Sequence, residues 1–460
     1  MIETLQHLPP AADSHGTLAA QFTDLAPPLT SRQAAIEAAR CLYCYDAPCM
    51  RACPTGIDVA GFIRNIHDQN INGAAIGILK QNIFGGSCAR VCPTEILCED
   101  ACVRNNAVER DPVKIGLLQR HAIDNARFAS HPFARGPATG KIVAVVGAGP
   151  AGLSCAHRLA MLGHDVVVFE AKPKAGGLNE YGIAKYKLPG DFAQQEVDFL
   201  LSIGGIDIQY GLALGDKLQL SDLHARFDAV FLGLGLGASR RLGLVGEDAP
   251  GLMAATDYIA ALRQASDLSL LSVPRRALVL GAGNTAVDMA VQIRRLGADE
   301  VTLVYRRGFE AMSATGHEIE IARLNGVRIR TWASPLEVLL DDAGRVAGMR
   351  FEETRMDEGR LARTGAFIDI AADAVFKAIG QAMAAPPDDG LAQGLWQGGE
   401  RIAVDASLRT RVPGIYAGGD CVASGQDLTV QAVQHGKLAA LVIHNALVIH
   451  NLAAEAAWPT

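Results

Sequence analysis

The sequence predicts an α/β protein in which two domains built on parallel sheets follow a small helical domain. Three observations support this fold class. Eight of the ten cysteines lie between Cys41 and Cys102, too densely for an ordinary apolar core. Two glycine-rich turns, beginning at Gly147 and Gly281, each join an apolar run typical of a buried strand to a helical pattern.

Composition and charge restrict the possible functions. The 460 residues are 49% hydrophobic, which is enough for two to four domains of ~100–200 residues each. A net charge of -7 gives no reason to expect nucleic acid or an anionic membrane. No uninterrupted apolar run reaches the ~20 residues that span a bilayer, and the run from Leu438, interrupted by His444 and Asn445, predicts an amphipathic docking helix. The amino terminus, MIETLQHL, differs from a secretory signal, so we expect a cytoplasmic protein.

The clustered cysteines form two motifs. The first reads C-x2-C-x4-C-x3-C-P and the second C-x3-C-P-x4-C-x3-C. A cysteine followed by proline at the end of such a run is typical of iron–sulfur proteins. Disulfides are disfavoured without a secretory signal, and structural zinc, which stays an alternative, usually uses two separate cysteine pairs. We therefore predict two [4Fe–4S] clusters, bound by cysteines from Cys41 to Cys102.

The segments around these motifs resemble a known family. Residues 40–63 read RCLYCYDAPCMRACPTGIDVAGFI, residues 85–102 read GGSCARVCPTEILCEDAC, and residues 112–120 read PVKIGLLQR. All three resemble the amino-terminal domain of dihydropyrimidine dehydrogenases and, less closely, of the small subunit of bacterial glutamate synthase. The resemblance implies one cluster on Cys41, Cys44, Cys49 and Cys102, and another on Cys53, Cys92, Cys98 and Gln119. Cys88 is then left over, and a surface glutamine is the alternative interpretation of Gln119.

The rest of the amino-terminal domain, predicted to cover residues 1–137, has a helical pattern. Residues 31–40 predict a capped helix, residues 57–80 a helix broken at Gly73, and residues 104–129 further helix. Residues 1 to about 30 are rich in Pro, Ala and Ser and predict a loose arm.

Residues 141–170 form a complete dinucleotide-binding unit. KIVAVV predicts a buried strand, and GAGPAG supplies Gly147, Gly149 and Gly152 before a helix and a second strand that ends on Glu170. The first glycine makes the tight turn, the second lets the backbone approach a pyrophosphate, and the third packs helix on strand. Glu170 stands where an acid binds the ribose hydroxyls.

A second such unit begins at residue 276. Its turn has Gly281, Gly283 and Ala286, and its helix begins with Asn284 and Thr285. The second strand ends in Arg306 and Arg307, where cations suit a 2′-phosphate, although a basic strand end touching only pyrophosphate or solvent is the alternative. Because the following segment offers Glu310 and no further arginine, we expect both NADH and NADPH to be accepted, with NADH favoured.

The late sequence places FAD in the first unit and the nicotinamide nucleotide in the second. VPGIYAGGD, ending in Gly419 and Asp420, resembles the FAD signature of two-dinucleotide flavoproteins, in which the aspartate contacts the ribityl chain. The helix beginning at Thr429 and Val430 would direct its amino terminus at the flavin, and GGLNEYGIAKYKLP, with Gly177 and Leu178, resembles a flavin-side loop of the same families. We therefore predict an FAD domain at 138–256 and 376–460 around a nicotinamide domain at 257–375.

No catalytic side chain stands out, so the chemistry is predicted to belong to the cofactors. Residues 257–375 contain no cysteine, which argues against disulfide reduction. The sequence ends after the flavin helix without a segment for a ~250-residue barrel. It resembles the nicotinamide-oxidising subunit of two-subunit dihydropyrimidine dehydrogenases, whose partner subunit carries FMN and iron–sulfur clusters and reduces uracil or thymine. The alternatives are a glutamate synthase small subunit and a non-catalytic adaptor that binds zinc and nucleotide.

Overall fold

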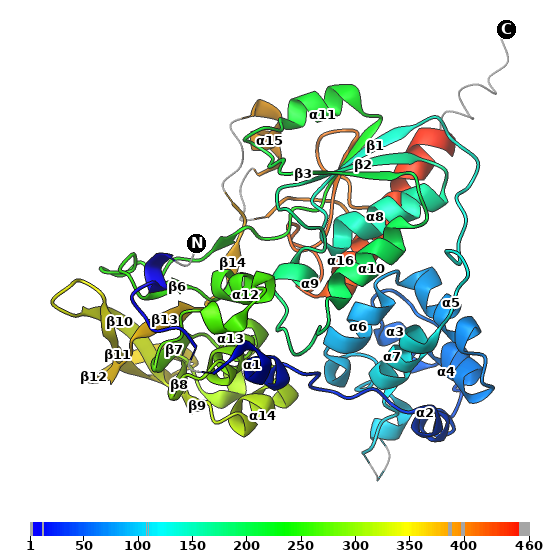
Figure 1. The fold of residues 1–460 in the computed structure, drawn as a ribbon. Helices are drawn as coiled ribbons and strands as arrows, with labels where there is room; N and C mark the ends of the chain where they lie inside the picture. Colours follow the sequence, from blue (N-terminus) through cyan, green and yellow to red (C-terminus); the bar gives the residue numbers. More distant parts are fainter. Residues whose placement is uncertain are drawn as a thin grey trace, which may run out of the picture. The chain divides into compact units, whose positions relative to one another are not determined.

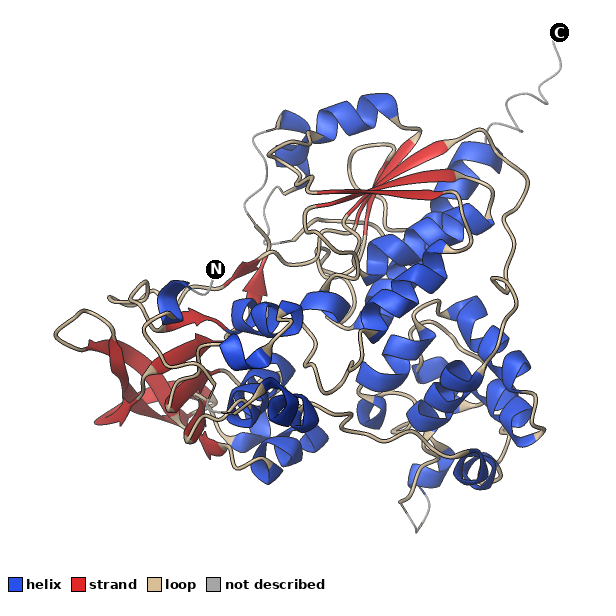
Figure 2. Ribbon diagram, viewed as in Figure 1, coloured by secondary structure: helices blue, strands red, loops and turns tan. Residues whose placement is uncertain are grey.

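The chain folds into two compact units (Figures 1 and 2). The computed structural model describes residues 3–11, 13–106, 108, 110–384, 389–396 and 401–449. Unit 1 comprises Met1–Leu25, Tyr181–Pro189 and Ala238–Ala382, and unit 2 comprises Ala26–Glu180, Gly190–Gly237 and Met383–Thr460.

Unit 2 contains a five-stranded parallel sheet in the order β15-β4-β1-β2-β3. The residues of the central strand β1 from Val143 to Val146 are buried, as expected when helices cover both faces of a parallel sheet. The predicted strands at both ends of the first dinucleotide unit are thus present, and the late segment returns to supply the edge strand. The strands are β1 (Ile142–Val146), β2 (Asp165–Glu170), β3 (Ile206–Tyr210), β4 (Ala229–Leu232) and β15 (Ile415–Ala417).

Three helices lie side by side against this sheet in Figure 1: α8 (Pro150–Met161), α10 (Phe192–Leu201) and α16 (Thr429–His444). The Ser154 hydroxyl of α8 donates to the Val433 carbonyl of α16 at 2.8 Å. At the crossing, Gly436 lies so close that a Cβ there would meet the Ala151 carbonyl oxygen and, at 2.8 Å, the Cys155 nitrogen. The remaining helices of this part are α9 (Leu178–Tyr181), α11 (Leu220–Arg226) and α15 (Gly390–Leu395).

Helix α16 continues as the π-helical turn η6 (Asn445–Ile449). The resulting helix, Thr429–Ile449, is 21 residues long and, by length and composition alone, apolar enough to cross a membrane. This helix is not an uninterrupted apolar run, since Gln434, Lys437 and His444 lie within it, but His444 and Asn445 do not end it. Its apolar side chains Val433, Ala440 and Ile443 are fully buried in the core around the sheet, which accounts for its composition.

The cysteine-bearing part of unit 2 is helical, as predicted. Thr30 caps the first helix through a capping box with Gln33, and the core contains Phe62, Ile78 and Leu118. The helices are α2 (Ser31–Ala38), α3 (Pro48–Ala52), α4 (Val59–His67), α5 (Ile71–Gln81), α6 (Gly85–Val91), η2 (Thr94–Ile96), η3 (Val103–Asn106) and α7 (Ile115–Asn125).

Two details of the helical prediction were wrong. The helix of residues 57–80 breaks between His67 and Ile71, and not at Gly73, because the Asn70 side chain caps α5 by accepting from the Gly73 nitrogen. In the segment 104–129, the only α-helix among the described residues is α7.

A buried carboxylate joins this helical part to the sheet within unit 2. Glu196 of α10 accepts hydrogen bonds from the backbone nitrogens of Gly86 and Ser87, at 2.8 and 3.0 Å, and from the Ser87 hydroxyl. Burial raises the pKa of Glu196 to about 7, although these hydrogen bonds and Arg90 lower it. Because these nitrogens are at the start of α6, the carboxylate faces donors that have no partner within the helix.

Unit 1 contains a second parallel sheet in the order β6-β13-β7-β8-β9. Its strands are β6 (Leu252–Ala254), β7 (Arg276–Leu280), β8 (Glu300–Val304), β9 (Arg328–Arg330) and β13 (Ala374–Lys377), and its helices are α12 (Ala255–Gln264), η4 (Leu268–Leu270), α13 (Asn284–Arg295), η5 (Phe309–Ala311) and α14 (Gly316–Leu324). An antiparallel sheet that the sequence analysis did not anticipate follows β9, made of β10 (Ala333–Leu340), β11 (Val346–Asp357) and β12 (Arg360–Ala371). The short strands β5 (Ala238–Ser239) and β14 (Gln381–Ala382) pair at the ends of the unit.

The amino-terminal segment is not a loose arm. It forms η1 (Glu3–Leu5) and α1 (His15–Gln21) and buries Leu5, Leu18 and Phe22 in the core of unit 1. The loop 181–189 also belongs to this unit, since Lys187 Nζ contacts Asp288 at 2.7 Å and Glu318 at 2.6 Å. These compact units divide the chain at other residues than 137, 256 and 375, and the predicted domain bounds stay a prediction.

The α8–α16 crossing gives a test of packing. We expect Gly436→Ala to lower the temperature at which FAD is released, because the methyl group has no room and overpacking costs about 1–3 kcal/mol. The matched control is Gly77→Ala in α5, where a Cβ meets nothing within 4 Å and the gain in helix propensity is up to ~1 kcal/mol. Flavin fluorescence during heating measures both variants. An unchanged release temperature in Gly436→Ala would contradict the packing argument.

Candidate functional site

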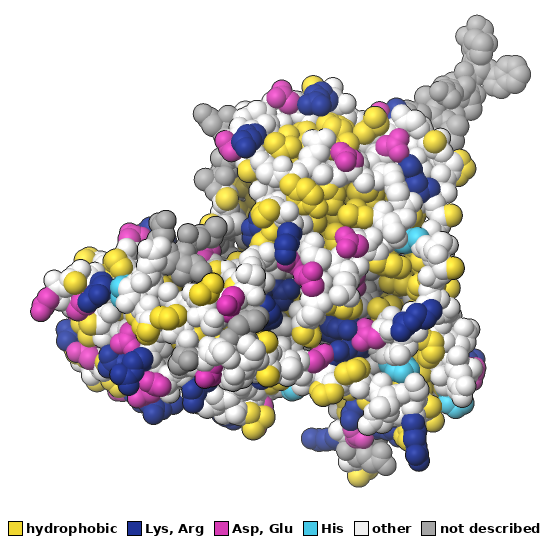
Figure 3. Space-filling model, in the orientation of Figure 1, with side chains coloured by type: hydrophobic (Ala, Val, Ile, Leu, Met, Phe, Trp, Pro, Cys, Tyr) yellow, Lys and Arg dark blue, Asp and Glu magenta, His cyan; other side chains and the backbone are white. Residues whose placement is uncertain are grey.

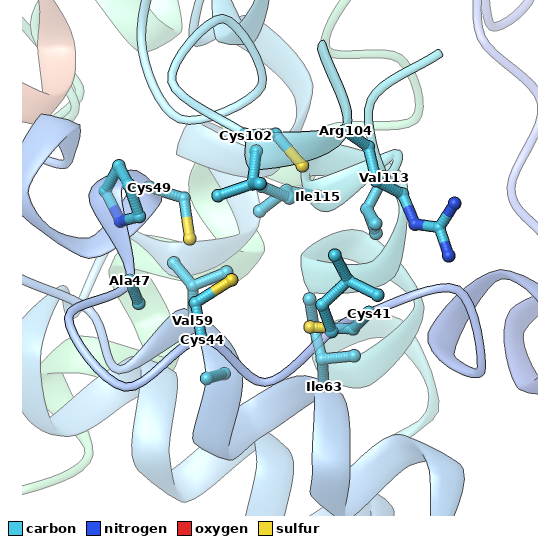
Figure 4. Close-up of a pocket in the computed structure, with 14 residues that line it drawn as sticks. Cys41, Cys44, Ala47, Cys49, Val59, Ile63, Cys102, Arg104, Val113 and Ile115 are labelled. Atoms are coloured by element: carbon cyan, nitrogen blue, oxygen red, sulfur yellow. The ribbon is translucent and has the colours of Figure 1, made fainter. Parts of the chain in front are cut away.

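The first group of cysteines lines a pocket in the helical part of unit 2 (Figure 4). Cys41 and Cys44 lie on the loop after α2, Cys49 lies in α3, and Cys102 directly precedes η3. Their four sulfur atoms face a common opening in Figure 4. The structure therefore brings together the four residues that the resemblance assigns to one cluster. The rest of the lining is mostly apolar, with Arg104 as its one charged side chain, and includes Val59, Ile63, Val103, Val113 and Ile115.

Crowding makes negative charge unfavourable in this pocket. Burial raises the pKa of Cys49 to about 11, and the neighbouring Cys102 and Cys41 add to the rise. Burial also raises the pKa of Cys41, although a backbone hydrogen bond at Tyr43 opposes it. A bound metal reverses this balance, since a coordinating thiol loses its proton to the cation. The pocket thus fits a positively charged iron core.

The second group consists of Cys53, Cys92 and Cys98. Cys53 follows α3, Cys92 ends α6, and Cys98 follows η2. The pKa of Cys92 is well above its ordinary value because of a hydrogen bond with Cys88, burial, and the charges of Cys98 and Cys53. Burial also raises the pKa of Cys98 well above its ordinary value, with Cys53 among the causes. These three sulfur atoms therefore lie close enough to affect one another, as the resemblance implies.

Two residues compete for the fourth position of the second group. Cys88 lies one turn before Cys92, is buried, and packs with Leu79 and Phe84. Gln119, on α7, is buried and donates through Nε2 to the Gly85 carbonyl oxygen at 2.7 Å. No described contact joins Gln119 to a sulfur atom, so its role as a ligand stays a prediction.

The spacing of the sulfur atoms bears on the zinc alternative. Zinc–sulfur bonds of ~2.3 Å place the four sulfur atoms of a tetrahedral site within ~4 Å of each other. Among the described residues, no three His, Cys, Asp or Glu side chains converge closely enough to hold one metal ion. The four sulfur atoms of the first group surround a shared opening, an arrangement that fits a cluster, which is larger than a single ion.

The first dinucleotide turn has the geometry that its three glycines predict. Gly147 has φ +98°, and a Cβ there would meet the Gly233 carbonyl oxygen. A Cβ on Gly152 would meet the Gly147 carbonyl oxygen, so the third glycine permits the close packing of α8. Gly149 caps α8 without a side-chain hydrogen bond, and a Cβ on Gly177 would lie 2.7 Å from the Gly149 Cα. The amino terminus of α8 therefore keeps free backbone donors for a pyrophosphate.

Glu170 ends β2 beside this turn. Its carboxylate oxygens accept from the backbone nitrogens of Ala148 and Lys172 at 2.7 and 2.8 Å. These two bonds fix the side chain at the edge of the glycine-rich turn. Its predicted contact with ribose hydroxyls is compatible with that position.

The predicted flavin end of the site gathers several partly satisfied polar groups. The Thr429 hydroxyl, in the first turn of α16, donates to Asn179 Oδ1 at 3.2 Å. The buried Nδ2 of Asn179 has no hydrogen-bond partner in the described structure, as expected where a polar ring system binds. Burial raises the pKa of Asp420 to about 6, and Asp427 adds to the rise while Arg401 opposes it. In Figure 3, apolar side chains gather over the sheet-bearing part of this unit.

The second dinucleotide turn repeats this geometry within unit 1. Gly281 has φ +142°, where a Cβ would meet the Ala378 carbonyl oxygen, and Ala286 is fully buried. Gly283 caps α13 without a side-chain hydrogen bond, and Asn284 Oδ1 accepts from the Thr315 nitrogen at 3.4 Å. Thr285, exposed in the first turn of α13, completes this predicted nucleotide-binding turn.

Arg306 and Arg307 follow β8 and are exposed. Their carbonyl oxygens accept from the Thr354 hydroxyl at 2.7 Å and from the Trp332 nitrogen at 3.1 Å, so the antiparallel sheet fixes this backbone. Among the described contacts, neither guanidinium forms an ion pair or a hydrogen bond. Glu310 lies on the same segment, with its carboxylate folded against Gly308. The arginine pair is thus available to a nucleotide, with an acid nearby.

Sequence reasoning missed three site residues that the structure reveals. Asn179 and Glu196 left no signal, because one amide and one acid on helical segments are ordinary. Lys437 left a weak signal, because it is the only charged residue between Leu428 and Ile443 in a largely apolar helix. In the structure, Lys437 is buried and its ammonium points into the helical part of unit 2.

Comparisons with known proteins agree with this arrangement. The family model described as pyridine nucleotide-disulphide oxidoreductase matches residues 141–436, and the model described as dihydropyrimidine dehydrogenase domain II, 4Fe-4S cluster, matches residues 18–130. The NAD-dependent dihydropyrimidine dehydrogenase subunit PreT of Salmonella typhimurium is 35% identical over 433 residues, covering 92% of this chain and 97% of that protein. The glutamate synthase [NADPH] small chain of Escherichia coli is 34% identical, covering 92% and 94%.

Solved structures share the fold at lower identity. Mycobacterium tuberculosis FprA in complex with NADPH aligns with a TM-score of 0.56 and 20% identity, covering 69% of this chain and 87% of that chain. The thioredoxin reductase of T. acidophilum aligns with a TM-score of 0.51 and 21% identity, covering 66% of this chain and 97% of that chain. These similarities extend to the fold alone.

Iron content tests the assignment of the cysteines. We expect Cys41→Ala to lose one cluster and to destabilise the helical part, while FAD stays bound. The matched control is Cys88→Ala, which should keep about eight irons per chain because Cys88 is a packing residue in this assignment. The measurement for both variants is the content of iron and of FAD per chain. Loss of a whole cluster in Cys88→Ala would contradict this assignment and would make Cys88, and not Gln119, the fourth ligand of the second cluster.

Nucleotide choice tests the arginine pair. Arg306→Ala should lower kcat/KM for NADPH by about ten- to a hundredfold, because a charge-assisted contact with the 2′-phosphate contributes roughly 1.5–3 kcal/mol. The value for NADH should change much less. Glu310→Gln should raise kcat/KM for NADPH, since it removes a negative charge near the same position. An equal loss for both nucleotides in Arg306→Ala would show that this side chain does not contact the 2′ position.

Proposed function

Since the chain belongs to the pyridine nucleotide-disulphide oxidoreductase family, in the form with an amino-terminal 4Fe-4S domain found in the dihydropyrimidine dehydrogenase subunit PreT, we propose that it is the electron-input subunit of such an enzyme. The matches confirm the predicted fold class and the cofactors FAD, a nicotinamide nucleotide and [4Fe–4S] clusters. When bound, FAD accepts electrons in pairs and the clusters pass them on singly.

The observation that carries this proposal is the assembly of both cysteine groups in the same unit as the FAD fold. Helix α6, which bears Cys88 and directly precedes Cys92, is tied to the FAD fold through Glu196. The chain's own residues thereby hold the predicted cluster sites in fixed relation to the flavin end. Unit 1, which carries the nicotinamide turn, contains no cysteine, so it offers no redox-active pair for disulfide reduction.

We infer that the first cysteine group faces the partner subunit. Apolar side chains beside it are exposed: Leu42 is 57% exposed, Val103 42%, and Tyr45 fully exposed. Exposed apolar residues around a redox centre are typical of a surface that another protein covers. The occupant proposed is the subunit that carries FMN and reduces uracil or thymine to the 5,6-dihydropyrimidine. A cytoplasmic location is part of the same proposal, supported by the core packing of α16.

The alternative acceptor is a glutamate synthase large subunit, since the small chain of that enzyme is almost equally similar. One segment favours the dihydropyrimidine dehydrogenase subunit over the glutamate synthase subunit. After Cys53 the chain reads PTGIDVAGFI, which resembles the dihydropyrimidine dehydrogenase form of this domain. A non-catalytic zinc and nucleotide adaptor fits poorly with sulfur atoms that do not converge on a single ion.

Reconstitution tests the proposal. The purified chain should oxidise NADH with ferricyanide as acceptor but should leave uracil unchanged, because this proposal assigns the pyrimidine site to the partner subunit. Adding the co-purified FMN subunit should start uracil reduction, measured as the loss of uracil absorbance. Leu42→Glu on the proposed docking surface should slow only the second reaction, whereas Leu270→Glu, at an exposed position in unit 1, should affect neither. Uracil reduction by the chain alone, or glutamate formation with the copurified partner, would contradict this assignment.

A further inference from the structure

The one charged side chain of α16 leaves the FAD fold and enters the helical part of unit 2. Lys437 follows Thr429 by about two turns, or ~12 Å along the helix axis. Its Nζ donates to the Thr55 carbonyl oxygen at 2.7 Å, and to the Gln81 carbonyl and side-chain oxygens at 3.0 Å each. Only 9% of the residue is exposed. An ammonium has three protons, and these three bonds use them all.

No acidic side chain neutralises this ammonium. The three acceptors are neutral carbonyl oxygens, and no ion pair of Lys437 occurs among the described residues. Burial lowers the pKa of Lys437 to about 8, with Arg158 contributing to the fall and Cys53 opposing it. A buried charge without a counter-charge is unfavourable. Gln81 is the last residue of α5, so the helix dipole offers partial compensation.

The second cysteine group lies next to Thr55 and can supply the counter-charge that Lys437 lacks. Thr55 follows Cys53 by two positions, and its hydroxyl oxygen is 3.3 Å from the Cys53 sulfur. Lys437 therefore fixes the backbone of the loop that leaves the second cysteine group. A [4Fe–4S] core held by three thiolates and a neutral amide carries net negative charge, which grows by one unit when the cluster is reduced. A fixed positive charge favours the reduced state of such a cluster.

We propose that Lys437 is a positioning residue for electron transfer, whose ammonium is the counter-charge of the cluster held by Cys53, Cys92 and Cys98. The inference rests on the proposed function, because it requires that cluster to be present. The hydrogen bonds of Lys437 connect the helix that begins at the flavin end with the loop after Cys53 and with the end of α5. It makes the cluster nearest α16 easier to reduce, which favours electron transfer from the flavin side.

The midpoint potential of the second cluster, from an anaerobic redox titration followed by electron paramagnetic resonance, tests this role in the complete chain. Lys437→Gln removes the charge but keeps a hydrogen-bond donor for Thr55. We expect its reduction equilibrium to become at least tenfold less favourable, which for one electron is a shift of 59 mV to lower potential. Lys437→Arg keeps the charge and should stay close to the wild type. Lys80→Gln, an exposed change of equal charge next to Gln81, should leave both clusters unchanged.

The outcomes separate this inference from the proposed function. Two intact clusters with unchanged potentials in Lys437→Gln would overturn the inference alone. Loss of the second cluster in both Lys437→Gln and Lys437→Met would also overturn it, because the side chain would then serve assembly only. A wild-type chain with far fewer than eight irons would overturn the cluster assignment, and the inference with it. A potential lowered in Lys437→Gln and restored in Lys437→Arg is the supporting result.

Discussion

The cost of ionising buried and crowded cysteines is the constraint on which the amino-terminal part of this protein depends. Burial raises the pKa of Cys49 and of Cys98, a hydrogen bond with Cys88 raises that of Cys92, and repulsion from neighbouring cysteines adds to the rise in both groups. The apolar core around Phe62 and Leu118 is built mainly by α2, α4, α5 and α7, whereas the eight cysteines lie on other segments. A positively charged iron core turns this repulsion into attraction and orders the loops at the same time. Folding and cluster binding are therefore coupled in this part of the chain.

Two buried charges of opposite sign then attach the helical part to the FAD fold. Glu196 faces the first backbone nitrogens of α6, and Lys437 faces the last carbonyl oxygen of α5. Each charge thus lies at the helix end whose partial charge is opposite to its own. Because both contacts are specific in direction, they fix the orientation of α5 and α6 against α10 and α16 more precisely than apolar packing would. The second cysteine group lies between these two attachments, at the end of α6 and just before Thr55.

Most of the fold could be predicted because its signals are local. The two dinucleotide turns, their strands and helices, and the late FAD segment all follow short patterns in which glycine, apolar residues and an acid occur at fixed spacing. The grouping of Cys41 with Cys102 came from resemblance, and the structure brings these residues together as that resemblance implies. Long-range features could not be predicted. The packing of Leu5 and Leu18 into unit 1, the sheet β10–β12, and the partners of Lys437 and Glu196 depend on contacts between distant segments, which no local pattern records.

The two cysteine groups have different neighbours, which fits the proposed direction of electron transfer. Beside the second group, Cys92 is in contact with the buried Cys88, and the loop after Cys53 is tied to the helix that begins at the flavin end. The first group opens among Leu42, Tyr45 and Val103, which are exposed. A buried cluster favours its less charged state, so a nearby cation makes its reduction more favourable. In the proposed arrangement, Lys437 supplies that cation beside the second group, and the first group, with its exposed apolar neighbours, is the point proposed for the exit of electrons from the subunit.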